Sequence, residues 1–108
     1  MIHVVALITL KPGMRAAFLE AFHVNAKVAR AQPGCVDYAV AIDMEGGPPF
    51  QTPCGPDGLV IQEVWTDMAS LGAHAAGAHM KEFGVKTKGI VANRAIYLLN
   101  RLPEGATA

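Results

Sequence analysis

Four side chains in the second half of the chain have the chemistry to act on a substrate. Glu63 and Trp65 share one face of a predicted strand, and His74 and His79 follow on a predicted helix. A histidine titrates near neutrality and can accept or release a proton. A carboxylate among valine, isoleucine and tryptophan neighbours is unfavourable inside a protein unless it has a partner. We therefore expect Glu63 to face a cavity or to pair with a histidine or an arginine.

The spacing of the two histidines argues against a metal site. Five residues on an ideal helix place the side chains about 140 degrees apart, so His74 and His79 are not the i, i+4 pair that binds zinc. We expect no bound metal. Taken singly, a histidine is more often a packed or solvent-facing residue than a catalyst. Core packing is the simpler interpretation of Trp65 and Phe22, because large aromatic side chains dominate protein cores.

The composition excludes several classes of ligand. The 108 residues include nine lysines and arginines and nine aspartates and glutamates, so no excess of positive charge attracts nucleic acid or an anionic membrane. No apolar run reaches the roughly 18 residues that span a bilayer, and residues 1–10 lack the basic start and cleavage site of a secretory signal. Phosphate-binding glycine loops and the Gly-x-Ser-x-Gly turn are absent. We expect a cytoplasmic protein that binds neither nucleic acid nor a membrane.

Cys35 and Cys54 are the two cysteines of the chain. They are too few for a disulfide scaffold and lack the paired spacing of a zinc site. Cys35 opens a predicted strand and is interpreted as a small buried residue, whereas Cys54 lies in a long loop and is interpreted as exposed and oxidisable. A bridge between them stays open, although nothing local requires it.

Hydrophobic periodicity predicts six elements that position these residues. Alternating or continuous apolar residues predict the strands, and a 3.6-residue repeat predicts the helices. The strands are expected over residues 2–10, 35–43, 59–66 and 94–101, and the helices over 14–31 and 67–83, with Gly77 as a candidate interruption. Residues 44–58 are rich in glycine and proline and predict a long connection. We expect one domain over residues 1–102 and a disordered tail over 103–108.

The order of these elements is strand, helix, strand, strand, helix, strand. It is the order of the α+β ferredoxin-like βαββαβ fold, with an antiparallel sheet and both helices on one face. The first and last strands have apolar residues at adjacent positions, so both faces of the sheet are apolar. Two helices cover only one face, and a chain of this length has no further layer to cover the other.

We therefore predict a homodimer through the sheet face, since twofold dimers are the commonest homo-oligomers. If each protomer buries roughly 700 Å² of mostly apolar area, the transfer free energy is on the order of 15 to 20 kcal/mol before entropic and polar losses. A fraction of that free energy makes the dimer obligate. The alternative is a monomer whose apolar patch binds another partner.

Three stretches of the chain resemble antibiotic biosynthesis monooxygenase (ABM) domains, especially the quinol monooxygenase-like branch. The first is Leu10-Lys11-Pro12-Gly13 leading into a helix. The second is Gln32-Pro33-Gly34-Cys35 with Tyr38 after it, similar to the family's Glu-Pro-Gly-Cys turn and following tyrosine. The third is Glu63-Val64-Trp65-Thr66-Asp67, then Leu71, His74 and His79, similar to the family's Glu-x-Trp strand end and helical histidines. The family's usual Ser-Pro-His-Phe is Gly77-Ala78-His79-Met80 in this chain, and residues 44–58 are longer than its common hairpin.

The resemblance implies a dimeric α/β barrel with a pocket between the sheet and the helices of each protomer. It also implies oxygenation of a small hydroxylated aromatic or quinol by molecular oxygen, with no metal, flavin or haem. In such chemistry the deprotonated substrate supplies the electrons, and the protein takes up a proton and stabilises the anion.

The resemblance also assigns roles to residues. His74 or His79 is expected to act as the acid and base, Trp65 to stack on the aromatic substrate, and Glu63 to orient a partner. The expected lining of the pocket includes Phe22, Tyr38 and Phe83. Two alternatives stay open: a non-catalytic dimer that binds a small molecule or a protein, and a haem-degrading monooxygenase. The haem alternative is the weaker, because that branch has an asparagine on the first strand and residues 2–10 contain none.

Overall fold

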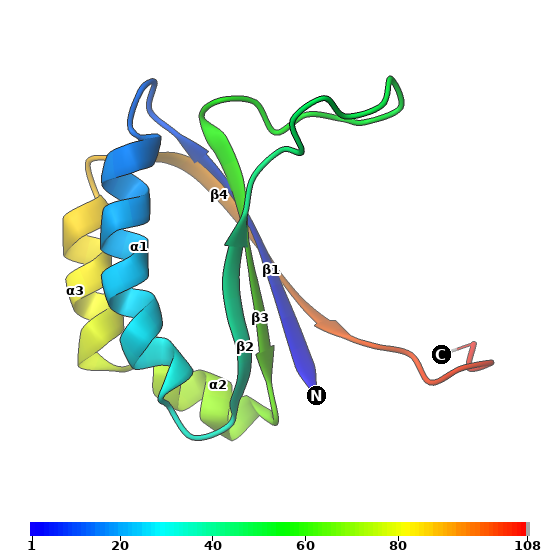
Figure 1. The fold of residues 1–108 in the computed structure, drawn as a ribbon. Helices are drawn as coiled ribbons and strands as arrows, with labels where there is room; N and C mark the ends of the chain where they lie inside the picture. The colour runs from blue at the N-terminus through cyan, green and yellow to red at the C-terminus, as the bar shows by residue number, and fades with distance from the viewer. Residues whose placement is uncertain (108) are drawn as a thin grey trace.

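The computed structural model describes residues 1–107, which form one sheet with helices on one side of it (Figure 1). The strands are β1 (Ile2–Leu10), β2 (Cys35–Ala41), β3 (Gly58–Trp65) and β4 (Val91–Asn100). The helices are α1 (Arg15–Arg30), α2 (Met68–Ala75) and α3 (Ala78–Thr87). Within residues 1–107, no helix is both long enough and apolar enough to cross a membrane.

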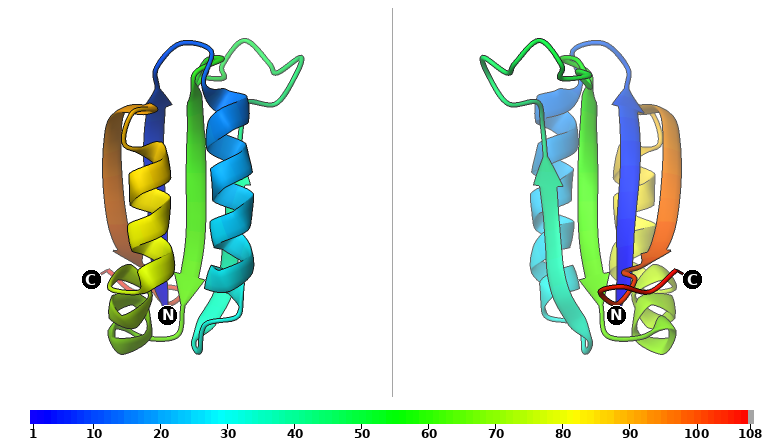
Figure 2. Two further views of the ribbon diagram at one scale, coloured as in Figure 1. Left: turned by 90° about the vertical axis from the view of Figure 1, so that its left-hand side faces the viewer. Right: turned by 90° about the vertical axis from the view of Figure 1, so that its right-hand side faces the viewer.

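The strands form one antiparallel sheet in the order β2-β3-β1-β4. One row of cross-strand partners runs over all of them and consists of Tyr38, Glu63, Val4 and Leu98. Partners in such a row point to the same face of a sheet. Figure 2 shows all the helices on one face, which is the face of this row. The predicted ferredoxin-like fold and its antiparallel sheet are confirmed.

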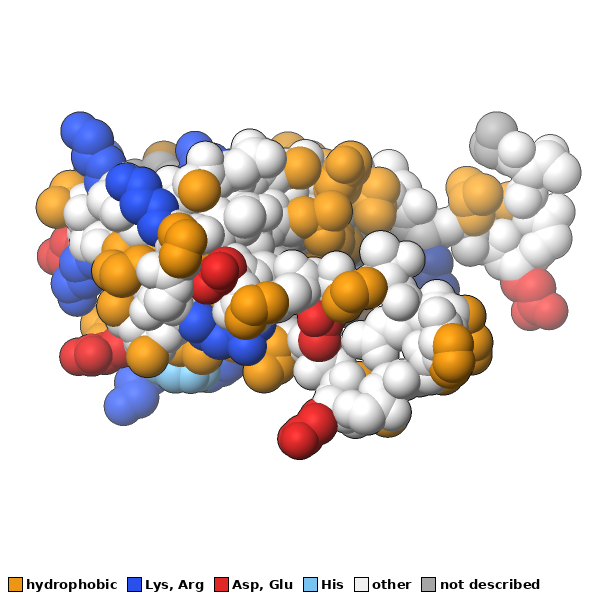
Figure 3. Space-filling view, turned by 90° about the horizontal axis from the view of Figure 1, so that it is seen from above, with side chains coloured by type: hydrophobic (Ala, Val, Ile, Leu, Met, Phe, Trp, Pro, Cys, Tyr) orange, Lys and Arg blue, Asp and Glu red, His pale blue; other side chains and the backbone are white. Residues whose placement is uncertain are grey.

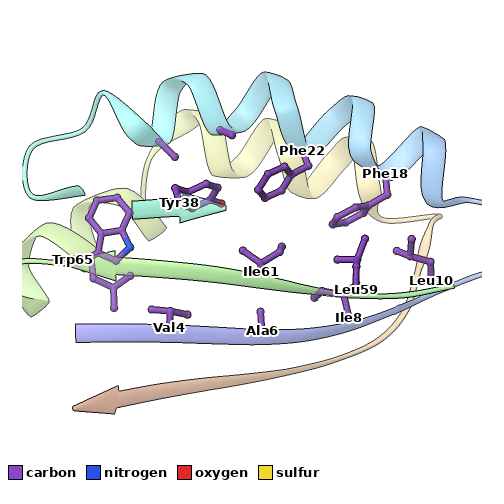
Figure 4. Packing of buried hydrophobic residues seen from close by; sticks show 13 residues of the cluster. Val4, Ala6, Ile8, Leu10, Phe18, Phe22, Tyr38, Leu59, Ile61 and Trp65 are labelled. Atoms are coloured by element: carbon purple, nitrogen blue, oxygen red, sulfur yellow. The ribbon is translucent and has the colours of Figure 1, made fainter. Parts of the chain in front are cut away.

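The hydrophobic core lies between the helices and the covered face of the sheet (Figure 4). Alternate residues of β1 and β3 point into it, as the two-residue period of a strand requires; they are Val4, Ala6, Ile8, Leu10, Leu59, Ile61 and Trp65. From α1, Phe18 and Phe22 pack on Phe83 of α3, with ring centroids 5.6 and 6.4 Å apart. Trp65 and Phe22 are fully buried, so their interpretation as core residues is confirmed.

The turn between α1 and β2 packs directly on the start of α2. Gly34 has a φ of 83°, a left-handed conformation that glycine adopts without strain. A Cβ at this position would collide with the side chains of Thr66 and Ser70. The backbone N–H of Thr66 donates to the carbonyl of Gly34 at 2.9 Å. Glycine therefore lets the turn close over the junction between β3 and α2, beside Trp65.

The opposite face of the sheet is open within residues 1–107. Its apolar side chains are Val5, Leu7, Val60, Val64, Tyr97 and Leu99. Leu7 is 44% exposed, Leu99 48% and Tyr97 49%. The loop of residues 42–57 and the segment after Asn100 both project on this side, from opposite ends of the sheet (Figures 1 and 2). Seen from above, hydrophobic side chains gather on the side of the molecule from which the loop and the C-terminal segment project (Figure 3).

The long loop is anchored at its base. Asp43 accepts hydrogen bonds from the backbone N–H groups of Cys54 and Gly55 at 2.8 and 2.9 Å. These bonds lower the pKa of the Asp43 carboxyl, because they stabilise the anion. Arg15 of α1 donates to the carbonyls of Gly55 and Gly58 at 2.8 and 2.9 Å. The base of the loop is thus tied to the first helix, while Phe50 near its tip is 89% exposed.

Some predicted boundaries differ from the structure. The helix expected over residues 67–83 is two helices, because Gly77 has an extended backbone with φ −70° and ψ 154°; the candidate interruption is confirmed. Strand β4 begins at Val91 rather than Arg94, because Val91 pairs with Leu10 across an irregular register. Residues 101–107 contain no helix or strand. The disorder of the tail stays a prediction, and its last residue, 108, lies outside the described residues.

Candidate active site

Glu63 and Trp65 lie two residues apart on β3, so both point to the covered face of the sheet. The indole Nε1–H of Trp65 donates a hydrogen bond to Oε1 of Glu63 at 2.9 Å. Burial raises the pKa of the Glu63 carboxyl, and this hydrogen bond opposes the rise because it stabilises the anion. The carboxylate on an otherwise apolar face therefore has a fixed donor.

His74 of α2 packs against this pair. Its ring stacks on the indole of Trp65 with centroids 4.6 Å apart, and Tyr38 meets it edge-on at 5.4 Å. Its Nε2 lies 3.8 Å from Oε1 of Glu63, so the expected pairing of Glu63 with a histidine is present. Burial, with a smaller contribution from His79, lowers the pKa of His74 to about 4. His74 is therefore neutral at pH 7 and able to accept a proton.

His79 contacts His74 directly, which corrects the expectation from an ideal helix. Its Nε2 lies 2.8 Å from Nδ1 of His74, at hydrogen-bond distance. On a continuous helix the two side chains would diverge by about 140 degrees. The break between α2 and α3 removes that constraint, because His79 follows the extended residue Gly77 at the start of a new helix. Glu63, His74 and His79 therefore form one chain of polar groups.

A pocket of about 290 Å³ opens beside Glu63 and His74. It lies between α2 and the covered face of the sheet, near β4. Apart from these two side chains its lining is apolar or glycine: Val4, Met68, Leu71, Gly72, Ala75, Met80, Ile96 and Leu98. Ile96 and Leu98 are each 52% exposed, so the pocket opens along β4. A ligand here would meet an apolar surface with one carboxylate and one imidazole.

A match between this chain and the sequence model of a protein family covers most of the chain. The sequence model of the family described as antibiotic biosynthesis monooxygenase matches residues 1–85. The chain belongs to the ABM family. The expectation drawn from the three resembling stretches is confirmed, and the function is of the monooxygenase type at the level of the family.

A curated ABM relative matches nearly the whole chain. The Escherichia coli K12 protein named "Probable quinol monooxygenase YgiN" is 35% identical over 101 residues, which cover 92% of this chain and 96% of that protein. Solved structures agree in fold at lower identity. A Pseudomonas aeruginosa protein superimposes with a TM-score of 0.79 at 24% identity over 94% of both chains. A Mycobacterium tuberculosis protein gives a TM-score of 0.77 at 20% identity over 97% of this chain and 98% of that one.

None of the four aromatic side chains expected at the substrate lines the pocket beside His74. Trp65 is fully buried and offers its indole face to His74 rather than to the pocket. Phe22 and Tyr38 stack on each other in the core, with centroids 5.5 Å apart, and neither lines the pocket beside His74. Phe83 lines a separate cavity between α1 and α3. Of these four side chains, Trp65 and Tyr38 contact the ring of His74.

Asn25 of α1 is a residue whose role the sequence did not reveal. It is 4% exposed, and its Nδ2 donates to the hydroxyl of Tyr38 at 3.2 Å and lies 3.4 Å from Sδ of Met80. Burial raises the pKa of Tyr38, so this hydroxyl stays protonated. The sequence does contain one signal for this role, because Asn25 is a polar residue within the apolar stripe of a helix. A buried amide at such a position needs a hydrogen-bond partner.

Neither cysteine lines the pocket beside His74. Cys35 and Cys54 are free thiols, and Cys54 is exposed as expected. Burial raises the pKa of Cys35, and desolvation together with the Asp43 carboxylate raises that of Cys54, so neither thiol is activated as a nucleophile. Within residues 1–107, no three His, Cys, Asp or Glu side chains are grouped to hold a metal ion.

Proposed function

We propose that this ABM protein is a cofactor-independent monooxygenase that uses molecular oxygen to oxidise a small hydroxylated aromatic or a quinol. In the quinol reaction one oxygen atom enters the ring and the other leaves as water, so that quinol and O2 give hydroxyquinone and water. Reduction of both oxygen atoms takes four electrons, and the substrate supplies all of them. The observation that supports the proposal is the pocket beside the buried pair Glu63 and His74.

The dimensions and lining of the pocket suit such a substrate. Its volume of about 290 Å³ lies near the lower end of the range for ligand pockets, about 300 to 1,000 Å³. A small aromatic ring system would gain from contact with the apolar side chains of α2 and β4. A hydroxyl group on that ring would find its polar partners only at Glu63 and His74.

Removal of the hydroxyl proton is the step that the protein must assist. His74 is neutral and its Nε2 lies on the side of Glu63, so we assign it the role of general base. A phenolic hydroxyl has a pKa of about 10, whereas that of His74 is about 4. The difference corresponds to about 8 kcal/mol against transfer. Another group must therefore stabilise the imidazolium that forms.

Glu63 is placed to supply that stabilisation. Opposite unit charges about 4 Å apart attract by about 4 kcal/mol at the effective dielectric constant of a partly buried site. Ionised Glu63, held 3.8 Å from Nε2 of His74, would thus offset about half of the unfavourable difference. Its hydrogen bond from Trp65 fixes the carboxylate in this position. The assigned roles are His74 as base, Glu63 as electrostatic partner and Trp65 as their support.

We infer that two copies of the chain pair through the open face of the sheet. The support is the set of apolar side chains on that face, with Leu7, Tyr97 and Leu99 about half exposed. Surfaces of this kind on soluble proteins mark association sites. The loop of residues 42–57 and the segment after Asn100 would flank the second copy, because both project on this side (Figure 1).

The experiment is an aerobic assay on purified protein with anthrone and 1,4-naphthoquinol, each followed by mass spectrometry. We expect products that have gained one oxygen and lost two hydrogens, in excess of heat-denatured protein. His74→Asn should abolish this excess, since asparagine mimics Nδ1 but lacks Nε2. Glu45→Gln, on an exposed loop carboxylate, is the matched control and should leave turnover unchanged.

The assay also separates the alternatives. Equal turnover before and after dialysis against a chelator is expected for a reaction that needs no metal. Binding of naphthoquinone with no product from either substrate would favour a non-catalytic binding protein. Unchanged turnover in His74→Asn would contradict the assigned base.

A further inference from the structure

His79 connects two separate openings of the protein. On one side its Nε2 lies 2.8 Å from Nδ1 of His74, and the opposite nitrogen of His74 lies toward Glu63 and the pocket. On the other side His79 lines a narrow cavity of about 20 Å³ between α1 and α3. His79 itself does not line the pocket of about 290 Å³. Its position is therefore behind the base and not beside a substrate.

The narrow cavity has the properties of a water site. About 10 to 15 Å³ of accessible space is enough for one water molecule, and the cavity has about 20 Å³. Asn25, which also lines it, has a buried Oδ1 that no group in residues 1–107 bonds to. Buried acceptors of this kind are normally satisfied by protein or water. At the outer end the lining includes Glu82 and Lys86, both of which are exposed.

We propose that His79 is a proton-relay residue, which moves protons between His74 and solvent through the cavity between α1 and α3. This role rests on the oxygenase function proposed above. When Nε2 of His74 takes the substrate proton, Nδ1 of His74 passes its proton to Nε2 of His79, and Nδ1 of His79 passes one to water. The same route returns a proton when the second oxygen atom leaves as water. No proton needs to cross the apolar pocket.

The titratable neighbours of the relay lie on β2, β3 and α3. His74 faces Glu63 of β3, Tyr38 of β2 and His79 of α3. On the cavity side, His79 shares the lining with Glu82 and Lys86 of α3, whereas the contribution of α1 is Ala21, Val24, Asn25 and Val28, none of which titrates. The relay therefore runs between Glu63 at one end and the exposed side chains of Glu82 and Lys86 at the other.

Gly77 permits the ring of His79 to lie where it does. A Cβ at this residue would lie 2.6 Å from Cε1 and 2.7 Å from Nδ1 of His79, closer than non-bonded atoms approach. Gly77→Ala should therefore displace the ring and break its contact with His74. Gly84, which lies on α3 like His79, has open space at its Cβ position. Gly84→Ala is thus a matched control that adds the same methyl group without touching the relay.

The first test measures proton movement without a substrate. In protein with ¹⁵N-labelled histidine, NMR at pH 7 gives the rate at which the ring N–H of His74 exchanges with water. We expect His79→Gln, which keeps a hydrogen-bonding atom but cannot relay a proton, to slow this exchange about tenfold or more. His23→Gln, on an exposed residue of α1, should leave the rate unchanged. An equal rate in wild type and His79→Gln would overturn the relay.

The second test uses turnover of 1,4-naphthoquinol. His79→Gln should lower kcat about tenfold with little change in KM, because His79 lies outside the pocket. In His79→Gly, which removes the ring and leaves space for a replacement, added imidazole should restore kcat in proportion to its concentration, an effect that a purely structural role would not give. The kcat of Gly77→Ala should fall as that of His79→Gln does, whereas the kcat of Gly84→Ala should equal that of wild type. Loss of kcat without rescue, or no loss, would overturn the relay. Absence of turnover in wild type would contradict the oxygenase instead, and the exchange rates would still decide the relay.

Discussion

The indole of Trp65 donates to the same carboxylate oxygen of Glu63 that faces His74. The donor lies 2.9 Å from Oε1, and Nε2 of His74 lies 3.8 Å from it. The indole also stacks on the imidazole. One tryptophan therefore sets the position of both groups assigned to the proton step, although it is fully buried and does not line the pocket.

Trp65→Phe tests this support. Phenylalanine lacks the Nε1–H donor and leaves a cavity in the core, so we expect the free energy of unfolding to fall by about 2 to 4 kcal/mol. Turnover should fall as well, because the carboxylate loses its fixed orientation. Chemical denaturation and the quinol assay measure the two effects. A change in stability below about 0.5 kcal/mol would contradict the buried hydrogen bond.

Glu63→Gln should make the protein more stable and less active. Burial raises the pKa of Glu63, which means that the ionised carboxylate lowers the stability of the folded state. The neutral amide removes this penalty and can still accept the hydrogen bond from Trp65. We expect a gain in stability of about 1 kcal/mol and a loss in kcat of about 100-fold. Glu45→Gln provides the comparison, and a Glu63→Gln variant with full activity would rule out the electrostatic role.

The stability of the protein should depend on pH through His74. Its pKa falls from the ordinary 6.5 to about 4 on folding, so the unfolded chain binds more protons between these values. Stability is therefore complete above about pH 6.5 and is lost as the pH falls toward 4, by on the order of 3 kcal/mol. The contribution of Glu63 to stability depends on pH in the opposite direction. Its pKa is raised above the ordinary 4.5, so this contribution is lost as the pH rises.

The His74 contribution can be isolated by comparison. Unfolding free energies are measured from pH 4 to pH 7 for the Glu63→Gln variant and for the double variant Glu63→Gln with His74→Asn. Both proteins lack the carboxylate whose titration opposes that of His74. The difference between the two proteins should grow as the pH rises from about 4 to 6.5 and then stay constant. A difference that does not vary with pH would show that His74 is not held neutral by burial.

Leu7→Lys should separate the proposed dimer. Leu7 is 44% exposed on the open face of the sheet, so lysine is tolerated in a single protomer but would be desolvated in the interface. Sedimentation equilibrium should find wild type as a dimer and Leu7→Lys as a monomer. Val85→Lys, on an apolar residue of α3 that is 79% exposed, should stay dimeric. A wild-type monomer at high concentration would contradict the pairing.

The periodicity of hydrophobic residues was enough to predict the fold, whereas the side-chain contacts of the site could be seen only in the structure. The continuous apolar run of β1 and the alternating apolar residues of β2 are both patterns typical of strands. The ideal-helix argument separated His74 from His79, since it could not include the change of direction at Gly77. Sequence also cannot tell which aromatic side chains fill the core and which border a void. For that reason Phe22, Tyr38 and Phe83 were expected at a pocket whose observed lining is mostly aliphatic.

The most direct test of the account is the fate of labelled oxygen in the reaction of anthrone. The protein is incubated under ¹⁸O2 in normal water, and the anthraquinone formed is analysed by mass spectrometry at early times. We predict one ¹⁸O atom per product molecule, at a rate that depends on enzyme concentration and is lost in His74→Asn. Product that forms at the same rate with wild type, His74→Asn and heat-denatured protein would contradict the assignment of this pocket as an oxygenase site.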